Sequence, residues 1–376
     1  MSALAERACA VAVRDALPED DAALVALAAA CPMAGDVTLC VDRAPSFFAL
    51  TRLEGEHCRV GVAEAGGEIV GCVAASVRTA YLNGRPTLTG YAGDLKVHPA
   101  YRGGGAADAL ERYTCTALRD LGGAGDLPTM LTILAGNRSM ERRAAGPRGL
   151  PRLARFATVL VHAVPLLWPR AASEDGVRVE PARESDVEEM GALWQRLAPQ
   201  RQLAPVLDAP ALHAWLRRAP GLDTHDYLVA RRRDGRIAAF LAVWEQRSFK
   251  QLRVLAYSAR LGAARAVVNA LAPLTRTPRL PAPGAVLPVL ATAHLCVPAG
   301  GAALLRALVR HAYAARRGGG HAFLTLALDR RDPLNAALRG LHAQPTAVDA
   351  YLTTPAGRWE GTPLDGRPLH FESALV

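Results

Sequence analysis

The chain has very few lysines, few aromatic residues and no long apolar run. Of its 44 basic residues only Lys96 and Lys250 are lysines, and aromatic residues make up 5% of the sequence. Proteins that bind single-stranded nucleic acid interleave aromatic and basic side chains, so this composition argues against a nucleic-acid partner. No apolar stretch approaches the ~20 residues that a membrane-spanning helix needs. The longest candidate, 156–168, is interrupted by His162 and Pro165 and predicts a strand.

The sequence also lacks the features of a leader peptide and of a cysteine-based metal site. Glu6 and Arg7 precede any apolar core, which argues against a signal peptide. There is no Cys-x-x-Cys pair and no histidine at metal-ligand spacing from a cysteine, so we expect no metal. Reduced thiols in a cytoplasmic protein are the expected state. The cysteines are Cys9, Cys31, Cys40, Cys58, Cys72, Cys115 and Cys296.

The basic residues are almost all arginines, and they are unevenly distributed. Together with the many alanines, the preference for arginine indicates codon bias in a GC-rich bacterial genome. The net charge of +9 divides into +1 for residues 1–170 and +8 for the remainder, with clusters at 231–233 and 316–317. We expect these clusters to be solvated surface. Attraction of an anionic substrate is the alternative.

One run, Val97-His-Pro-Ala-Tyr-Arg-Gly-Gly-Gly-Ala-Ala-Asp-Ala-Leu110, carries most of the functional information. It follows an extended apolar stretch and opens a helical pattern. Three consecutive glycines at such a junction let the backbone approach a ligand without interference from Cβ atoms. The free amides and the positive dipole end of the following helix face the same space. The run therefore predicts a pyrophosphate site, against the simpler alternative of a glycine-rich turn.

The details of the run distinguish between nucleotide motifs. Ala106-Ala107 cannot replace the Lys-Ser or Lys-Thr pair of a Walker loop, and the third glycine of a dinucleotide fingerprint is absent. Instead Arg102, Gly105 and Ala107 fit Arg/Gln-x-x-Gly-x-Gly/Ala, preceded by Val97-x-Pro99. This resembles the acetyl-coenzyme A (acetyl-CoA) motif of the GNAT superfamily of N-acetyltransferases.

The two halves of the chain share an outline that also resembles this superfamily. Each half predicts strand, helix, three strands, helix, strand, helix and strand, which is a mixed sheet flanked by helices. The implied fold class is α/β (α+β mixed sheet), with two tandem acetyltransferase-like domains. We place the acetyl-CoA-binding domain at 8–168, a linker at 169–176, a second domain at 175–355 and a C-terminal tail at 356–376.

The second copy departs from the motif. Its counterpart of the glycine run, Val297-Pro-Ala-Gly-Gly-Ala-Ala-Leu304, is shorter and has no arginine, so we interpret this copy as degenerate. It also contains an insertion, 249–276, for which the apolar pattern predicts a helix. This helix would either shape a substrate cleft or join the two lobes.

The resemblance implies specific roles for residues of the first copy. Main-chain groups of Leu95 and Val97 would bond the pantetheine arm, and Asn137 would contact it or simply cap the following helix. The remaining cofactor residues surround the pyrophosphate, with Arg102 as the nearby cation. The expected amide donors are Gly103, Gly104, Gly105, Ala106 and Ala107.

The catalytic groups are less defined. Asp94 is the one acid on the strand before the glycine run, and Tyr91 is the other titratable candidate. Strand alternation places their side chains on opposite faces unless a bulge changes the parity. Asp94 has an alternative structural role as the partner of Lys96. Relatives often carry a tyrosine after the asparagine as the acid for the thiolate, and 137–150 has none.

The leading hypothesis is an acetyl-CoA-dependent N-acetyltransferase that acts on a small-molecule or peptide amine. A catalytically silent acyl-CoA-binding or regulatory protein of the same fold is the alternative. A third hypothesis, an aminoacyl-transferase that uses charged transfer RNA, fits the basic second half but not the intact glycine run. The sequence does not indicate an oligomeric state.

Overall fold

The computed structural model describes residues 11–33, 35–123, 127–144, 146, 153–168, 177–275, 279–357, 359 and 361–376. The predicted linker 169–176 and the start of the first predicted domain lie outside these residues. The first half has strands β1 Ala12–Asp15, β2 Val37–Asp42, β3 His57–Ala65, β4 Glu68–Leu82, β5 Arg85–Val97, β6 Thr129–Leu134 and β7 Ala154–Pro165. Its helices are α1 Asp21–Ala29, α2 Phe48–Thr51, α3 Ala106–Gly122 and α4 Arg138–Ala144.

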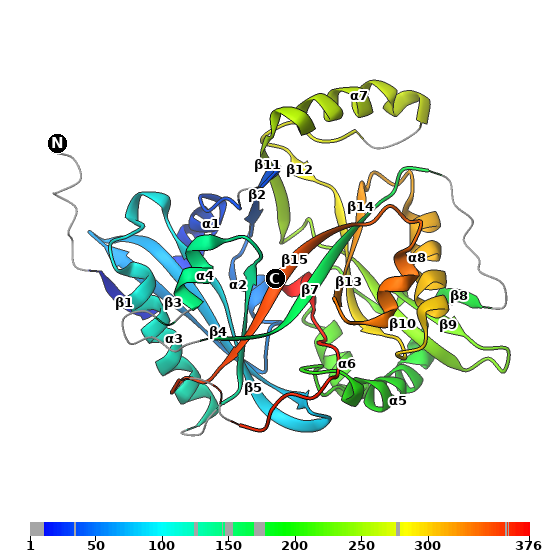
Figure 1. Cartoon of the computed structure of the whole chain (residues 1–376), viewed down its shortest axis with the longest axis horizontal. Helices are drawn as coiled ribbons and strands as arrows, with labels where there is room; N and C mark the ends of the chain where they lie inside the picture. The colour runs from blue at the N-terminus through cyan, green and yellow to red at the C-terminus, as the bar shows by residue number, and fades with distance from the viewer. Residues whose placement is uncertain are drawn as a thin grey trace.

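The second half repeats much of this order. Its strands are β8 Arg178–Pro181, β9 Tyr227–Arg231, β10 Ile237–Glu245, β11 Gln251–Tyr257, β12 Val286–Leu287, β13 Val289–Cys296, β14 Phe323–Asp329 and β15 Gln344–Thr353. Its helices are α5 Val187–Leu197, α6 Ala209–Leu216, α7 Ala259–Thr275 and α8 Ala302–Arg316. The predicted α/β fold class is confirmed: a large mixed sheet is flanked by helices (Figure 1).

The two halves merge into one sheet by exchanging strands. The order across the sheet is β1-β3-β4-β5-β6-β15-β7-β14-β13-β10-β9-β8. Strand β15 of the second half thus lies between β6 and β7, and β7 of the first half pairs with β14 and β15. A second, three-stranded sheet joins β2 to β11 and β12. Because the exchanged strands bury apolar side chains such as Val159 and Ala350, the exchange joins the lobes through a shared core.

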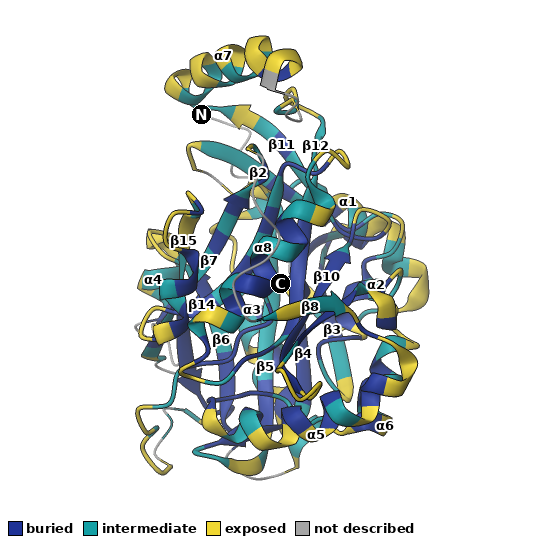
Figure 2. Cartoon of the chain, turned by 90° about the vertical axis from the view of Figure 1, so that its right-hand side faces the viewer, coloured by how far each residue is buried: buried dark blue, intermediate teal, exposed yellow. Residues whose placement is uncertain are grey.

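Part of the predicted insertion helix is a strand. Residues 251–257 form β11, which pairs antiparallel with β2, so the prediction of one helix over 249–276 is wrong for this portion. A short apolar run can form either a helix or a strand. These residues form a strand because they pair with the edge of β2. The helix proper, α7, stands away from the body, and its apolar Val267 and Leu274 are exposed (Figure 2).

Helix α3 packs closely on the first half of the sheet. Its buried residues recur at helical spacing, from Ala106 and Leu110 to Leu118. Glycines beneath it permit this approach: a Cβ at Gly61 would lie 2.4 Å from the ring of Tyr113, and a Cβ at Gly71 would lie 3.0 Å from Leu110. The close packing fixes the start of α3 beside the end of β5.

Among the described residues, no helix is both long and apolar enough to cross a membrane. The described cysteines are all free, and burial raises the pKa of the Cys72 thiol to about 12. In the same part of the chain, His, Cys, Asp and Glu side chains do not gather in threes or more in a way that would hold a metal ion.

Candidate active site

The strand before the glycine run separates from its neighbour. Parallel pairing between β5 and β6 covers Gly90–Ala92 of β5 and Thr129–Leu131 of β6, and ends there. Beyond this point β5 stays paired with β4, and β6 stays paired with β15. The two strands therefore enclose a wedge, and the second part of β5 turns its free main-chain edge toward it.

The glycine turn adjoins the open end of this wedge. Gly103 and Gly105 both have φ +85°, a left-handed conformation that favours glycine. Gly105 is the N-cap of α3. A Cβ built on either glycine would meet no described atom within 4 Å. The turn thus leaves open space in front of the first amides of α3, which have no intrahelical partners.

The other predicted cofactor residues lie around this space. Some of them already make hydrogen bonds within the protein. The Gly104 amide donates to the Tyr101 carbonyl at 3.4 Å, so it is a weaker donor to a ligand than its neighbours. Arg102 is exposed, and its Nε donates to the Val97 carbonyl at 3.2 Å. Its guanidinium therefore folds back over the end of β5.

Leu95 and Val97 turn their side chains into the core beneath α3. Their backbones lie on the separated part of β5. Asn137 begins the segment after β6, where its Oδ1 accepts a hydrogen bond from the Met140 amide at 3.3 Å. The capping role is thus present at this residue.

A β-bulge at Asp94 and Leu95 changes which side chains of β5 share a face. Cys72 pairs with Lys96 while Ala74 pairs with Gly93, so Asp94 and Leu95 together oppose one residue of β4. Asp94 has φ +52°. The extra residue reverses the alternation: Tyr91, opposite Ser76, and Lys96, opposite Cys72, share a face of the sheet.

Asp94 is the centre of a buried ion cluster. Its two carboxylate oxygens accept from Arg43 and Lys96. Arg43 follows β2 and is 1% exposed. Burial alone would raise the pKa of Asp94, but the two cations outweigh it and hold the pKa well below its usual range. The structural pairing of Asp94 with Lys96 is therefore present, with Arg43 as a second partner.

Tyr91 lies near the closed end of the wedge. Its hydroxyl is 3.5 Å from the Thr132 hydroxyl on β6. Burial, followed by the charge of Glu54, raises the pKa of Tyr91 above its ordinary value. The side chain is therefore a neutral phenol at physiological pH.

Three residues of this cluster have no place in the sequence motif: Arg43, Glu54 and Lys250. Lys250 comes from the second half, and its Nζ donates to main-chain oxygens of Ser373, Ala374 and Val376. Burial, followed by the charge of Arg43, lowers the pKa of Lys250 to about 7. The sequence held one signal for Lys250, which is the rarity of lysine. The two lysines of the chain, Lys96 and Lys250, both lie in this cluster.

The second half repeats the wedge and the bulge. Strand β13 pairs with β14 only over Val289–Ala291, and its register with β10 shifts before Cys296. The bulge residue is His294, with φ +49°. Its position corresponds to that of Asp94 in the first half.

This second wedge is filled by the chain itself. The His294 amide donates to both carboxylate oxygens of Glu372, at 3.0 and 3.1 Å. Glu372 also pairs with His370 at 2.8 Å, and His294 Nδ1 lies 2.6 Å from the Tyr227 hydroxyl. All four side chains are buried. The segment that follows β15 thus occupies the main-chain edge that stays free in the first half.

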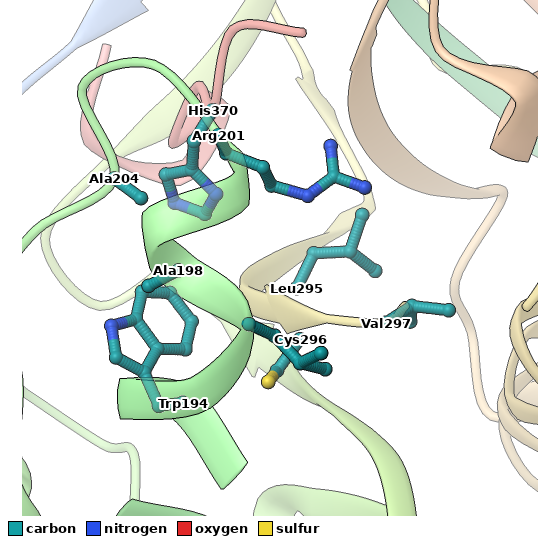
Figure 3. A pocket seen from close by; sticks show the side chains of 9 residues that line it. Trp194, Ala198, Arg201, Ala204, Leu295, Cys296, Val297 and His370 are labelled. Atoms are coloured by element: carbon teal, nitrogen blue, oxygen red, sulfur yellow. The ribbon is translucent and has the colours of Figure 1, made fainter. Parts of the chain in front are cut away.

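The cavity beside this second wedge is very small. Figure 3 shows Trp194, Arg201, Cys296 and His370 closing around it. Its volume is about 10 Å³, which is room for about one water molecule. In the turn before α8, a Cβ on Gly301 would lie 2.9 Å from the Pro298 carbonyl oxygen, whereas a Cβ on Gly300 would meet no described atom within 4 Å.

Comparison with known proteins agrees with this geometry. Residues 24–141 match the acetyltransferase (GNAT) family. No curated protein sequence matches the chain. Similar solved structures include a GCN5-related N-acetyltransferase from Sphaerobacter thermophilus, at 16% identity, TM-score 0.58, and coverage of 94% of this chain and 97% of that one.

Two further structures have the same fold along most of this chain. A tandem GNAT protein from the clavulanic acid biosynthesis pathway has 13% identity and TM-score 0.56, over 94% of this chain and all of its own. The N-myristoyltransferase of Saccharomyces cerevisiae, solved with bound myristoyl-CoA, has 11% identity and TM-score 0.63, over 95% of this chain and 87% of that one. Residues 24–141 of this chain are thus similar to the GNAT acetyltransferase family, and the chain as a whole has a fold similar to that of the tandem GNAT protein.

Proposed function

We propose that this chain is an acetyl-CoA-dependent N-acetyltransferase that uses its first lobe for the thioester. The observation that carries the proposal is the open glycine turn at Gly103–Gly105, beside a wedge with a free main-chain edge. A diphosphate needs amide donors and a positive helix end, and an extended thioester arm needs a strand edge. The turn and the wedge adjoin each other in this lobe.

In this proposal the amides of Gly103, Gly105, Ala106 and Ala107 hold the diphosphate, and Gly104 contributes less. Main-chain groups of Leu95 and Val97 bond the pantetheine arm. Arg102 supplies positive charge at the turn, from the end of β5 where its Nε is held. Asn137 contacts the arm from the start of α4 while it caps that helix.

The catalytic roles of Asp94 and Tyr91 follow from their ionisation. Asp94 faces the acceptor side as a permanent anion that holds Arg43 and Lys96 in place. Tyr91 stays neutral and acts as a hydrogen-bond donor near the closed end of the wedge.

We propose further that the second lobe binds no cofactor. Glu372 accepts hydrogen bonds from the His294 amide. The position of His294 corresponds to one that faces the ligand in the first lobe. A cavity of about 10 Å³ cannot accept a nucleotide thioester.

The acceptor is a small-molecule or peptide amine that approaches between the lobes, and the reaction uses no metal.

The test is release of free thiol from acetyl-CoA over a panel of small-molecule and peptide amines, with wild-type protein and Gly105→Glu. Glutamate at Gly105 would place a side chain and a negative charge where the diphosphate lies. Wild type should release thiol with at least one amine, and the variant should be folded and inactive. Binding of acetyl-CoA by calorimetry without thiol release would favour the silent acyl-CoA-binding protein instead.

A further inference from the structure

Glu54 is a buried carboxyl with an unused oxygen. It lies between α2 and β3, where its amide donates to the Thr51 carbonyl at 3.2 Å. The residue is 5% exposed, and Oε2 has no hydrogen-bond partner among the described residues. A buried carboxyl without partners is costly. Two residues on, Glu56 is an exposed acid that accepts from the Thr79 amide at 3.0 Å.

Unsatisfied donors lie in the same cluster. Arg43 donates to Asp94 through one nitrogen, while its Nε and its other terminal nitrogen are buried and meet no acceptor in the described part of the chain. Native proteins leave few buried polar atoms without partners. Arg43 thus keeps buried donors, and Glu54 a buried acceptor, without a protein partner among the described residues.

Charges from several elements act on Glu54. The charges of Asp94 and Lys96 on β5 and of Arg78 on β4 act on the pKa of Glu54, and the charge of Glu54 acts on the pKa of Tyr91 on β5. The remaining neighbours are Arg43, Cys58 on β3, and Lys250 of the second half. The elements around Glu54 therefore belong to both lobes.

The two carboxyls of the cluster differ in ionisation. Burial, and next the charge of Asp94, raises the pKa of Glu54 to about 8, although Arg43, Lys96 and Arg78 oppose the shift. Asp94 has a lowered pKa because the same cations contact it directly. Adjacent acids whose pKa values are pushed apart have different chemical tasks. A group that titrates near the working pH is suited to proton transfer.

We propose that Glu54 is the proton acceptor for the amine substrate, and that Asp94 positions Arg43 and Lys96 around it. This inference rests on the proposed function. The amine nitrogen forms the new C–N bond as the C–S bond breaks. The surplus proton of that nitrogen goes to the Glu54 carboxylate, directly or through one bound water. The leaving thiolate takes a proton from solvent, and Glu54 returns its own to solvent.

The test compares the pH profiles of kcat for wild type, Glu54→Gln and Glu56→Gln. The wild-type rate should rise with pH through a limb near pH 8, since the base must be ionised. Glu54→Gln should lose about 10²–10⁴-fold in kcat and lose this limb. Glu56→Gln, the matched control, should keep both the rate and the limb, which separates the limb from ionisation of the acceptor itself.

Asp94→Asn provides a second readout that does not depend on replacing Glu54. Removing the negative charge of Asp94 should lower the pKa of Glu54 and move the limb to lower pH. An unshifted limb, or a folded Glu54→Gln with near-wild-type kcat and an intact limb, overturns the inference. If wild type itself releases no thiol with any amine, the proposed function fails instead. Thermal melting of each variant establishes that it is folded.

Discussion

The diphosphate site can be tested by adding one methyl group at Gly105. This residue has φ +85°, and a Cβ there meets no described atom within 4 Å. Gly105→Ala therefore causes no steric clash in the unliganded protein. Its cost is that of a non-glycine residue in the left-handed region, about 1–2 kcal/mol in the free energy of unfolding.

The second half offers a matched control. Gly235 lies in the turn between β9 and β10, has φ +84°, and also has open space at its Cβ position. Gly235→Ala should destabilise the protein by the same about 1–2 kcal/mol without changing the affinity for acetyl-CoA. Gly105→Ala should raise the Kd at least about tenfold, or ~1.4 kcal/mol, because the methyl group occupies the approach to the α3 amides.

Isothermal titration calorimetry and urea unfolding on both variants measure these two quantities. The informative result is a difference in Kd between variants of equal stability. If both variants bind acetyl-CoA with the wild-type Kd, the diphosphate does not contact this turn, and the assignment of the amides is wrong. If both lose binding equally, the loss reflects destabilisation alone.

Two other predictions concern the second lobe. Calorimetry should give a stoichiometry of one acetyl-CoA per chain, and Gly105→Glu should abolish this binding. A stoichiometry of two would show that the second wedge also binds acetyl-CoA. Burial lowers the pKa of His294 to about 4 in the folded protein. Stability should therefore be full above the unfolded pKa of about 6.5 and fall, by up to about 3 kcal/mol, between that pH and 4. Urea midpoints across this range should show the loss, and His294→Gln should flatten it.

The sequence was sufficient for the parts of the fold that depend on local patterns. The glycine run, the start of α3 and the repeated order of strands and helices follow from spacing and turn residues. The exchange of β7 and β15 cannot be predicted in this way, because the sequence of an apolar strand does not indicate which strand it pairs with. The strand β11 was missed for the same reason: its identity depends on the edge of β2.

The position of the Asp94 side chain on the sheet shows how one extra residue in a strand changes a prediction. Strict alternation places Tyr91 and Asp94 on opposite faces, and the sequence allows a bulge without locating it. The structure has the bulge at Asp94, so both side chains reach the same cluster. Glu54 had no signal at all, since it stands in a short connection with no motif around it. Only tertiary packing reveals its burial.

The choice of lysine at position 250 links the site to the segment after β15. Three main-chain oxygens, from Ser373, Ala374 and Val376, converge on its Nζ. An ammonium group has three donors around one nitrogen, whereas arginine offers a planar fork. In a chain with two lysines among its 44 basic residues, this geometry accounts for the lysine at position 250. The same segment places Glu372 in the second wedge, so one stretch of chain both fills the second lobe and contributes to the ion cluster of the first.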